Sequence, residues 1–343
     1  MLCARVVDTL ARMQRVEDAA TTLLGGFGGG PGQLPHCAPT YAATLSLVTV
    51  GTEAALRAID RRRLYRFLMS MKTPEGAFRM HHDGEVDTRA AYTALSVASL
   101  TNILTPELSA GTAEWIARCQ TFEGGFGAEP FNEAHGGYAF CAVAALAILD
   151  KMDAVDLDAV LRWVTLRQMP RSGGFQGRGN KLVDACYSFW QGSTPAVLSV
   201  VTKGRYSVQT GSASVVGAAG ENVSPVGGSL LMDQERLQEY ILKCCQFIKG
   251  GLRDKPGKGR DYYHTCYALS GLSIAQHSGS SESVCNIGSD ENVLQRTDPI
   301  YNVRVDKLAT ARAYFSKLPC SHESLMETPE PARSDEDEDM YEL

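Results

Sequence analysis

The chain has 343 residues, of which 44% are hydrophobic, so it can bury a sizeable core as one large domain or two of ordinary size. Its net charge of −6 argues against a broad nucleic-acid-binding face, and no apolar run has the length of a membrane span or the form of a secretory signal. The ten cysteines are scattered, and Cys244 and Cys245 are adjacent, which fits the reducing cytoplasm better than a disulfide framework.

After an N-terminal segment, five similar boxes divide the chain into repeats. Each box carries a marker residue, and the five markers are Phe27, Phe78, Phe126, Phe175 and Leu252, with separations of 51, 48, 49 and 77 residues. The last interval is long by about the length of a stretch rich in Gly, Ser and Val. We therefore predict a flexible surface insertion near residues 196–232.

Every repeat predicts the same pair of helices. A charged helix such as 157–168 ends at Gly-Gly, a polar loop follows, and a small apolar helix such as 138–149 comes next. The apolar helices have little polar interruption, so we expect them to be buried on most sides. The pattern indicates an all-α protein with an inner ring of apolar helices inside an outer ring. An open α-solenoid would have the same local pattern without closure.

Reactive side chains recur where each loop becomes an inner helix. Nine to twelve residues after the markers lie His36, Asp87, Arg89, His135, Asp184, Cys186 and His264. In a ring of repeats, equivalent positions lie at the same end of the molecule. We therefore expect side chains that are far apart in the sequence to converge on one mouth.

One group among them has the composition of a metal site. Asp184, Cys186 and His264 offer a carboxylate, a thiolate and an imidazole, which suit Zn²⁺, and three protein ligands leave the open position typical of a catalytic site. Asp184 and Cys186 stand at a helix start, where the backbone is not yet regular, so both can reach one ion. Alternatively, Asp184 is a helix N-cap and Cys186 a small buried apolar residue.

A second group is cationic and aromatic. Arg178 and Lys181 precede the Asp184 helix, His135 and Tyr187 stand at neighbouring helix starts, and basic residues crowd the loop 255–260. Helix N-termini with glycine-rich approaches attract anions, so a phosphate or diphosphate is the expected ligand, with an apolar chain beside it in a pocket lined by Tyr and Phe. Solvated loop charges are the alternative interpretation.

Taken together, the boxes "GGFGGGPGQLPHCAPTYAA", "DTRAAYTALSVASLTNILTPE", "EAHGGYAF", "GGFQGRGNKLVDACYSFWQ" and "GGLRDKPGKGRDYYHTCYALSGLSIAQH" resemble the β subunits of protein prenyltransferases, those of the farnesyltransferases in particular. The resemblance runs from about residue 25 to 314, apart from the insertion. It implies an α–α toroid of helical hairpins over residues 25–320. The family has a longer segment before the first box, so residues 1–24 are expected to be atypical and the toroid incomplete at its N-terminus. The acidic segment 321–343 is expected to be a disordered tail.

The resemblance also implies an activity and its partners. A heterodimer with an α subunit would transfer farnesyl from farnesyl diphosphate to the cysteine of a C-terminal CaaX motif in a protein substrate. Zn²⁺ would be held by Asp184, Cys186 and His264, while Asp254 would help to hold Mg²⁺. Geranylgeranyltransferase type I relatives typically carry lysine at the position of Asp254, so the aspartate favours farnesyl transfer.

Further roles follow from the same resemblance. The diphosphate would be bound by His135, Arg178, Lys181 and Tyr187, of which Lys181 and Tyr187 would also take part in catalysis. The isoprenoid pocket would be lined by Arg89, Tyr92, Tyr138 and Trp190, and Tyr263 would border the peptide site. Two alternatives stay open: a geranylgeranyltransferase type I β subunit, and an inactive helical-repeat module that still contacts an α partner.

Overall fold

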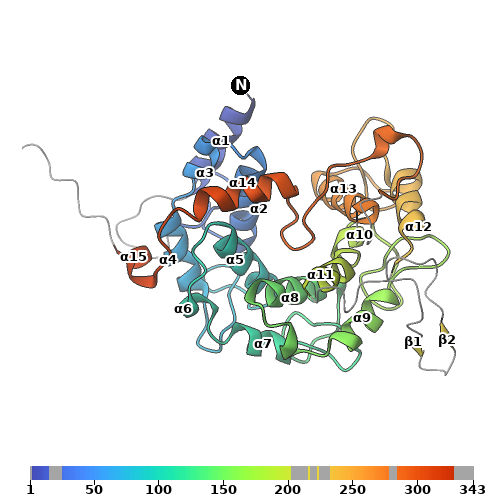
Figure 1. The fold of residues 1–343 in the computed structure, drawn as a ribbon, viewed down its shortest axis with the longest axis horizontal. Coiled ribbons are helices and arrows are strands. Elements are labelled where there is room, and N and C mark those ends of the chain that lie inside the picture. Colours follow the sequence, from blue (N-terminus) through green and yellow to red (C-terminus); the bar gives the residue numbers. More distant parts are fainter. Residues whose placement is uncertain are drawn as a thin grey trace, which may run out of the picture.

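A computed structural model describes residues 2–14, 25–201, 232–277 and 284–327, together with two short strands. Almost all regular structure in these residues is helical, as expected (Figure 1). The strands β1 (Val215–Val216) and β2 (Asn222–Val223) pair antiparallel, with Val215 opposite Val223. No helix in the described part of the chain has both the length and the apolar character that crossing a membrane requires.

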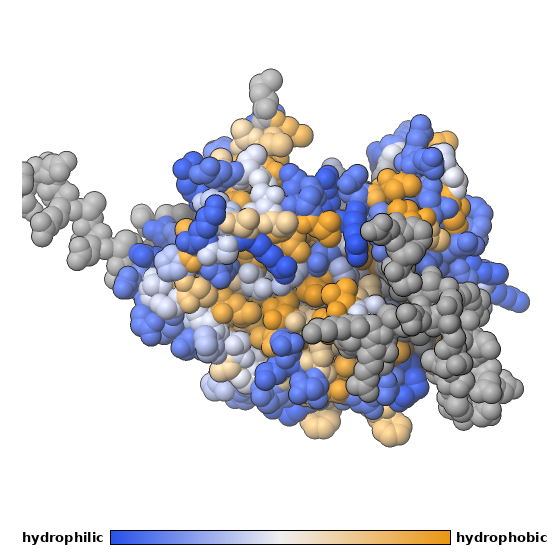
Figure 2. All heavy atoms as spheres, in the orientation of Figure 1, coloured by the Kyte–Doolittle hydropathy of each residue, from blue (hydrophilic) through white to orange (hydrophobic). Residues whose placement is uncertain are grey.

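The inner helices follow each loop and pack against one another in chain order. They are α2 (Cys37–Val50), α5 (Thr88–Leu100), α8 (Gly136–Leu149), α10 (Tyr187–Trp190) with α11 (Ser193–Val201), and α13 (Tyr262–His277). Nearly all residues of α5 are buried, which confirms the expectation from its apolar sequence. Figure 2 shows apolar side chains gathered at the centre of this face, near α5 and α8, with hydrophilic residues around them.

The outer helices alternate with the inner ones. They are α1 (Leu2–Met13), α4 (Arg61–Met71), α7 (Thr112–Arg118), α9 (Leu157–Thr165), and α12 (Gln234–Glu239), which continues as the π-helix η2 (Tyr240–Cys245). Short helices join the layers: α3 (Glu53–Arg57), α6 (Pro106–Ser109) and the 3₁₀ turns η1 (Met152–Ala154) and η3 (Asp290–Asn292). Near the C-terminus, α14 (Val305–Phe315) packs against α2, and α15 (His322–Met326) packs against α4.

The marker residues anchor the repeats in the core. The four marker phenylalanines are fully buried, and every marker forms an isolated antiparallel bridge with a residue just after the preceding outer helix. The backbone conformation at the first glycine of the first four boxes, and the close approach of the next outer helix, explain why glycine is needed there. At Gly124 and Gly173 φ is positive, and a Cβ would clash with the carbonyl group of Ala159 or Arg236 on the next outer helix.

A glutamine at the end of an outer helix holds the start of the next one. Gln168 Nε2 donates to the carbonyl oxygens of Gly173 and Asp233, both at 2.9 Å, and its Oε1 accepts from the Asp233 amide at 2.8 Å. The same three bonds are made by Gln14 with Gly25 and Asp60, and by Gln120 with Gly124 and Asp156. This clamp fixes the stacking of successive outer helices.

Backbone hydrogen bonds also join each loop to the next. In four successive repeats, a backbone amide near the start of the inner helix donates to a backbone carbonyl oxygen in the next loop. The acceptor is always the second residue after the next marker. The pairs are Cys37–Met80 at 2.7 Å, Thr88–Ala128 at 2.9 Å, Gly136–Gly177 at 2.7 Å and Ala185–Asp254 at 2.9 Å. These bonds place all the loops that precede inner helices at one end of the molecule, as the repeat predicted.

Three predicted boundaries need correction. The N-terminal segment is not atypical over residues 2–14, because α1 is followed by the clamp residue Gln14; residues 15–24 lie outside the described residues. Helix α11 extends to Val201, inside the predicted insertion 196–232, most of which is not described. Helix α15 occupies the start of the predicted disordered tail. Tyr65 binds the His322 side chain there, and Arg61 donates to the Pro319 carbonyl oxygen; residues 328–343 are not described.

The glutamine clamp predicts a measurable loss of stability. Replacing Gln168→Ala removes three hydrogen bonds and leaves backbone groups of Gly173 and Asp233 without these partners, so we expect the free energy of unfolding to fall by about 2 kcal/mol. Denaturant titration measures the change. Gln295→Ala, at an exposed position, serves as the control and should change stability by less than about 0.5 kcal/mol. Equal effects of the two substitutions would contradict the role of the clamp.

Candidate functional site

The capping side chains at the starts of the inner helices share one local geometry. His36, Asp87, His135 and Asp184 each accept a hydrogen bond from the backbone amide two residues later, at 3.0, 2.8, 3.1 and 2.8 Å respectively. Asp184 makes this bond in the turn before α10, whose N-cap is Cys186, so the structure does not confirm the N-cap interpretation of Asp184. The bond does not exclude a second role, because a carboxylate has two oxygens and can accept several bonds.

The predicted metal ligands converge. Asp184 and Cys186 lie just before α10, His264 lies in the first turn of α13, and their ligand atoms are all within 4.8 Å of one another. His264 Nε2 lies 3.2 Å from Asp184 Oδ1, yet it is buried and has no hydrogen bond of acceptable geometry. Two ligands on one tetrahedral zinc ion would be about 3.3 Å apart. The donor set and its spacing therefore fit Zn²⁺.

Asp261 orients the histidine of this trio. Its Oδ2 lies 2.6 Å from His264 Nδ1, and its Oδ1 accepts from the His264 amide at 2.7 Å. These two bonds lower the pKa of the Asp261 carboxyl, with the backbone bond as the larger cause. A carboxylate on Nδ1 fixes the tautomer that leaves Nε2 free for a metal. The prediction missed Asp261, although it lies nine residues after Leu252, at the repeat position of Asp184.

Cys186 is a buried thiol, as its alternative interpretation held. Only 4% of it is exposed, and burial, followed by the negative charge of Asp184, raises the pKa of the thiol. Without a cation the thiol is therefore protonated at neutral pH. A metal ion at the trio would provide the positive charge that makes the thiolate the favoured form.

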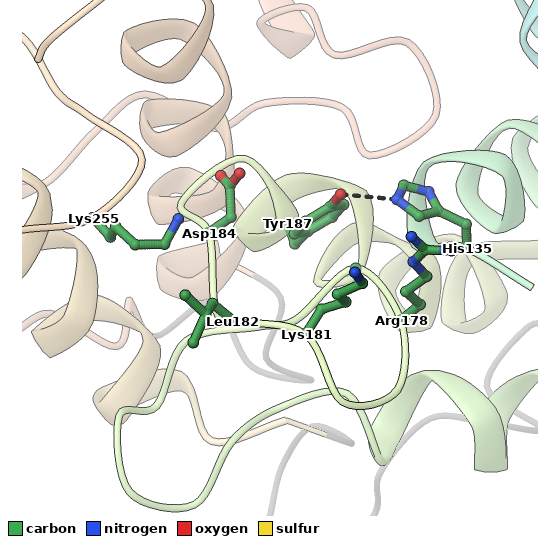
Figure 3. Close-up of a pocket in the computed structure, with 8 residues that line it drawn as sticks. His135, Arg178, Lys181, Leu182, Asp184, Tyr187 and Lys255 are labelled. Carbon is green, nitrogen blue, oxygen red and sulfur yellow. Dashed lines mark hydrogen bonds between the residues drawn. The ribbon is translucent and has the colours of Figure 1, made fainter. Parts of the chain in front are cut away.

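A cationic cavity of about 240 Å³ adjoins the trio. Its lining consists of His135, Gly177, Arg178, Lys181, Leu182, Asp184, Tyr187 and Lys255 (Figure 3). The amino group of Lys255 points toward Asp184, which belongs both to this cavity and to the metal-ligand trio. Three cationic side chains around one cavity suit an anion with several oxygens. The sequence predicted a phosphate or diphosphate ligand for His135, Arg178, Lys181 and Tyr187, and all four line this cavity.

Hydrogen bonds and packing fix one wall of the cavity. Tyr187 Oη and His135 Nε2 are 2.9 Å apart, and burial, followed by the charge of Arg178, lowers the pKa of His135. The Tyr187 ring covers Gly177 so closely that a Cβ there would clash with it, which explains the glycine. Arg178 forms an ion pair with the exposed carboxylate of Glu133, which an anionic ligand would have to replace.

The last loop supplies fewer cavity residues than expected. Lys255 lines the cavity and also pairs with the carboxylate of Asp254. Lys258 is exposed and does not line it. Arg260 donates to the carbonyl oxygens of Lys249 and Gly250, at 2.5 Å each, so it holds the loop and does not face the cavity.

The aromatic residues assigned to an isoprenoid pocket fall into two groups of contacts, one around Trp190 and one around Tyr138. Trp190 packs 4.3 Å from Tyr267, ring centre to ring centre, and its Nε1 donates to Tyr263 Oη at 3.0 Å. Tyr138 contacts the His135 ring and lies under the guanidinium of Arg89. The site residues of the Trp190 group that sequence reasoning missed are Phe140, Phe189 and Tyr267.

Two of the predicted residues are already engaged. Tyr92 is almost fully buried, and its hydroxyl donates to the Ile300 carbonyl oxygen at 2.6 Å. Arg89 pairs with Asp87 and Glu85, and the bond with Asp87 is the main cause that raises the pKa of the guanidinium. Tyr92 thus belongs to the buried part of the aromatic group around Trp190, where it contacts Phe140, and Arg89 lies against Tyr138.

Comparison with known proteins adds an independent line of evidence. A family model described as the prenyltransferase alpha-alpha toroid domain matches residues 3–303. The chain is 42% identical over 338 residues to the protein farnesyltransferase subunit beta of Pisum sativum, covering 86% of this chain and 80% of that one. The corresponding subunit of Schizosaccharomyces pombe is 44% identical over 322 residues, with 92% and 78% covered.

More distant relatives share the architecture. The geranylgeranyl transferase type-2 subunit beta of Saccharomyces cerevisiae is 33% identical over 253 residues, covering 73% of this chain and 69% of that one. The solved structure of Candida albicans protein geranylgeranyltransferase-I complexed with GGPP superimposes with a TM-score of 0.64 and 18% identity, covering 92% of this chain and 85% of that one. This likeness confirms the α–α toroid fold and carries no further argument.

The trio predicts one zinc ion per chain. Elemental analysis of the folded protein should find it, and Cys186→Ala should lose most of it because one of three ligands is removed. Cys141→Ala, which replaces a buried cysteine on α8, is the matched control and should retain the metal. Stoichiometric zinc in a variant with alanine at all three ligand positions would place the metal elsewhere.

Proposed function

Since this chain belongs to the family of protein farnesyltransferase β subunits, we propose that it transfers a farnesyl group from farnesyl diphosphate to the cysteine thiol of a C-terminal CaaX motif. It acts as the catalytic subunit of a heterodimer with a farnesyltransferase α subunit. The observation that carries the proposal is the position of Asp184, which belongs both to the metal-ligand trio and to the cationic cavity. A thiol nucleophile at the first and a diphosphate in the second would be neighbours.

Asp184, Cys186 and His264 would hold the zinc ion, and Asp261 would orient His264. When bound, the zinc ion would favour the thiolate form of the substrate cysteine. Burial of Cys186 keeps this side chain a ligand and not an alternative nucleophile.

The cationic cavity supports the other half of the reaction. As the bond from sulfur to C1 of farnesyl forms, the bond from C1 to the diphosphate oxygen breaks, and the electron pair leaves with the diphosphate. Arg178, Lys181 and Lys255 stabilise that growing negative charge, and Tyr187 and His135 bind diphosphate oxygens. The start of α8, which His135 caps, adds the positive end of its helix dipole.

The two aromatic groups serve the apolar part of the substrates. Trp190 and Tyr138 would contact the isoprenoid chain beside the cavity, with Arg89 at the pocket edge and Tyr92 supporting the wall from behind. Tyr263, which is half-exposed and hydrogen-bonded to Trp190, would border the peptide. All ten cysteines are free, which supports a location in the cytoplasm.

A transfer assay tests the proposed function. The chain is combined with a farnesyltransferase α subunit, zinc and magnesium, and a CaaX peptide is offered with farnesyl or geranylgeranyl diphosphate. We expect faster transfer of farnesyl, and no transfer to a peptide whose CaaX cysteine is serine. Faster geranylgeranyl transfer would indicate a type I geranylgeranyltransferase. Binding of the α subunit without any transfer would indicate an inactive helical-repeat module.

Asp254 is proposed to help to hold a magnesium ion on the diphosphate. Its carboxylate pairs with Lys255 in this structure; a magnesium ion held by Asp254 would replace that contact and leave the Lys255 amino group available to the diphosphate. Asp254→Lys should remove most of the magnesium stimulation of farnesyl transfer, measured by magnesium titration. Asp290→Lys, at an exposed turn, is the control and should leave the titration unchanged. An unaltered titration for Asp254→Lys would refute this role.

A further inference from the structure

The carbonyl oxygen of Asp254 is a meeting point of three donors. The Ala185 amide donates to it at 2.9 Å, the Tyr240 hydroxyl at 3.0 Å, and the Cys245 thiol lies 3.6 Å away. The first of these is one of the four backbone bonds that join successive loops. The other two come from the outer helix and supplement it.

This oxygen joins the two halves of the site, the metal-ligand trio and the cationic cavity. Ala185 stands between the metal ligands Asp184 and Cys186, while Asp254 precedes the cavity residue Lys255. A shift of the Asp254 peptide group would therefore move the metal-ligand segment relative to the cationic loop. Whatever holds that carbonyl oxygen in place sets the distance between the two halves.

Tyr240 is suited to this task by its place in the repeat. Its ring covers Gly174, the second glycine of its box, just as Phe67 covers Gly26 and Trp163 covers Gly125. Phe67 and Trp163 have no hydroxyl group, so packing alone explains an aromatic residue at this position but not a tyrosine. Only 3% of Tyr240 is exposed, so its hydroxyl needs a partner inside the protein, and the Asp254 carbonyl provides it.

The helix that carries Tyr240 is locally unusual. Residues Tyr240–Cys245 form a π-helix, whose hydrogen bonds link residues five apart along the chain. Tyr240 and Cys245 are five apart, and both side chains reach the same carbonyl oxygen. Such π-helical turns occur frequently at functional sites.

We propose that Tyr240 is a positioning residue, which through the Asp254 carbonyl oxygen couples the metal-ligand segment 184–186 to the cationic loop that contains Lys255. The proposal rests on the proposed function for its catalytic meaning. Its structural content concerns metal retention and anion binding, which can be measured without farnesyl transfer.

The test compares Tyr240→Phe with Tyr65→Phe in the zinc-loaded heterodimer with the α subunit. Both tyrosines are buried on outer helices and donate or accept through the hydroxyl, but Tyr65 binds Thr105 and His322, which lie outside the site. Tyr240→Phe should speed zinc loss to a chelator and weaken binding of inorganic diphosphate, each by about three- to tenfold. Tyr65→Phe should change neither, although thermal unfolding of both variants shifts downward.

A third variant distinguishes the role of the Asp254 carbonyl oxygen from that of its side-chain carboxylate. Asp254→Asn keeps the carbonyl oxygen, so it should retain zinc like the parent protein. Unchanged zinc loss and diphosphate affinity in Tyr240→Phe would overturn the proposal. Equal changes in Tyr65→Phe would also overturn it, because the effect would then be global. Rapid zinc loss in Asp254→Asn would overturn it as well, because the coupling would then depend on the carboxylate and not on the carbonyl oxygen. A protein that shows the expected binding changes but transfers no farnesyl would contradict the proposed function alone.

Discussion

A single backbone hydrogen bond, repeated from loop to loop, is the constraint on which the site depends. Each time, the amide that follows a helix-capping side chain binds a carbonyl oxygen in the next loop, at 2.7–2.9 Å. Because both partners are backbone groups, the link tolerates any side chain at the capping position. The protein can therefore place histidine, aspartate or a metal ligand there without altering the scaffold, and residues 80 positions apart, such as Asp184 and His264, meet at one mouth.

The site joins two regions of opposite electrostatic character. The trio with Asp261 brings together two carboxylates and a buried thiol, while the cavity beside it carries Arg178, Lys181 and Lys255. A divalent cation would balance the first region, and a diphosphate would balance the second. In the folded chain Arg178 pairs with Glu133 and Lys255 with Asp254, and the shared Asp184 keeps the two regions close.

Much of this was readable from the sequence, for physical reasons. The Gly-Gly stops and the apolar inner helices have local causes, so the all-α fold, the repeat and the convergence of Asp184, Cys186 and His264 could be predicted. Contacts between repeats were harder to predict from the sequence. The glutamine clamp that gives α1 its place, the docking of α15 on Tyr65, and the link from Tyr240 to Asp254 depend on partners tens or hundreds of residues away. Asp261 could have been predicted, since it lies nine residues after Leu252, as Asp184 lies nine residues after Phe175.

The most direct test of the central claim is X-ray absorption at the zinc edge of the heterodimer, before and after addition of a CaaX peptide. The account predicts one sulfur ligand at about 2.3 Å and nitrogen or oxygen ligands at about 2.0–2.1 Å in the free enzyme, and a second sulfur when the peptide binds. A peptide with serine in place of cysteine should add no sulfur. A sulfur count that stays at one with the cysteine peptide, or a free enzyme without any sulfur ligand, would contradict it.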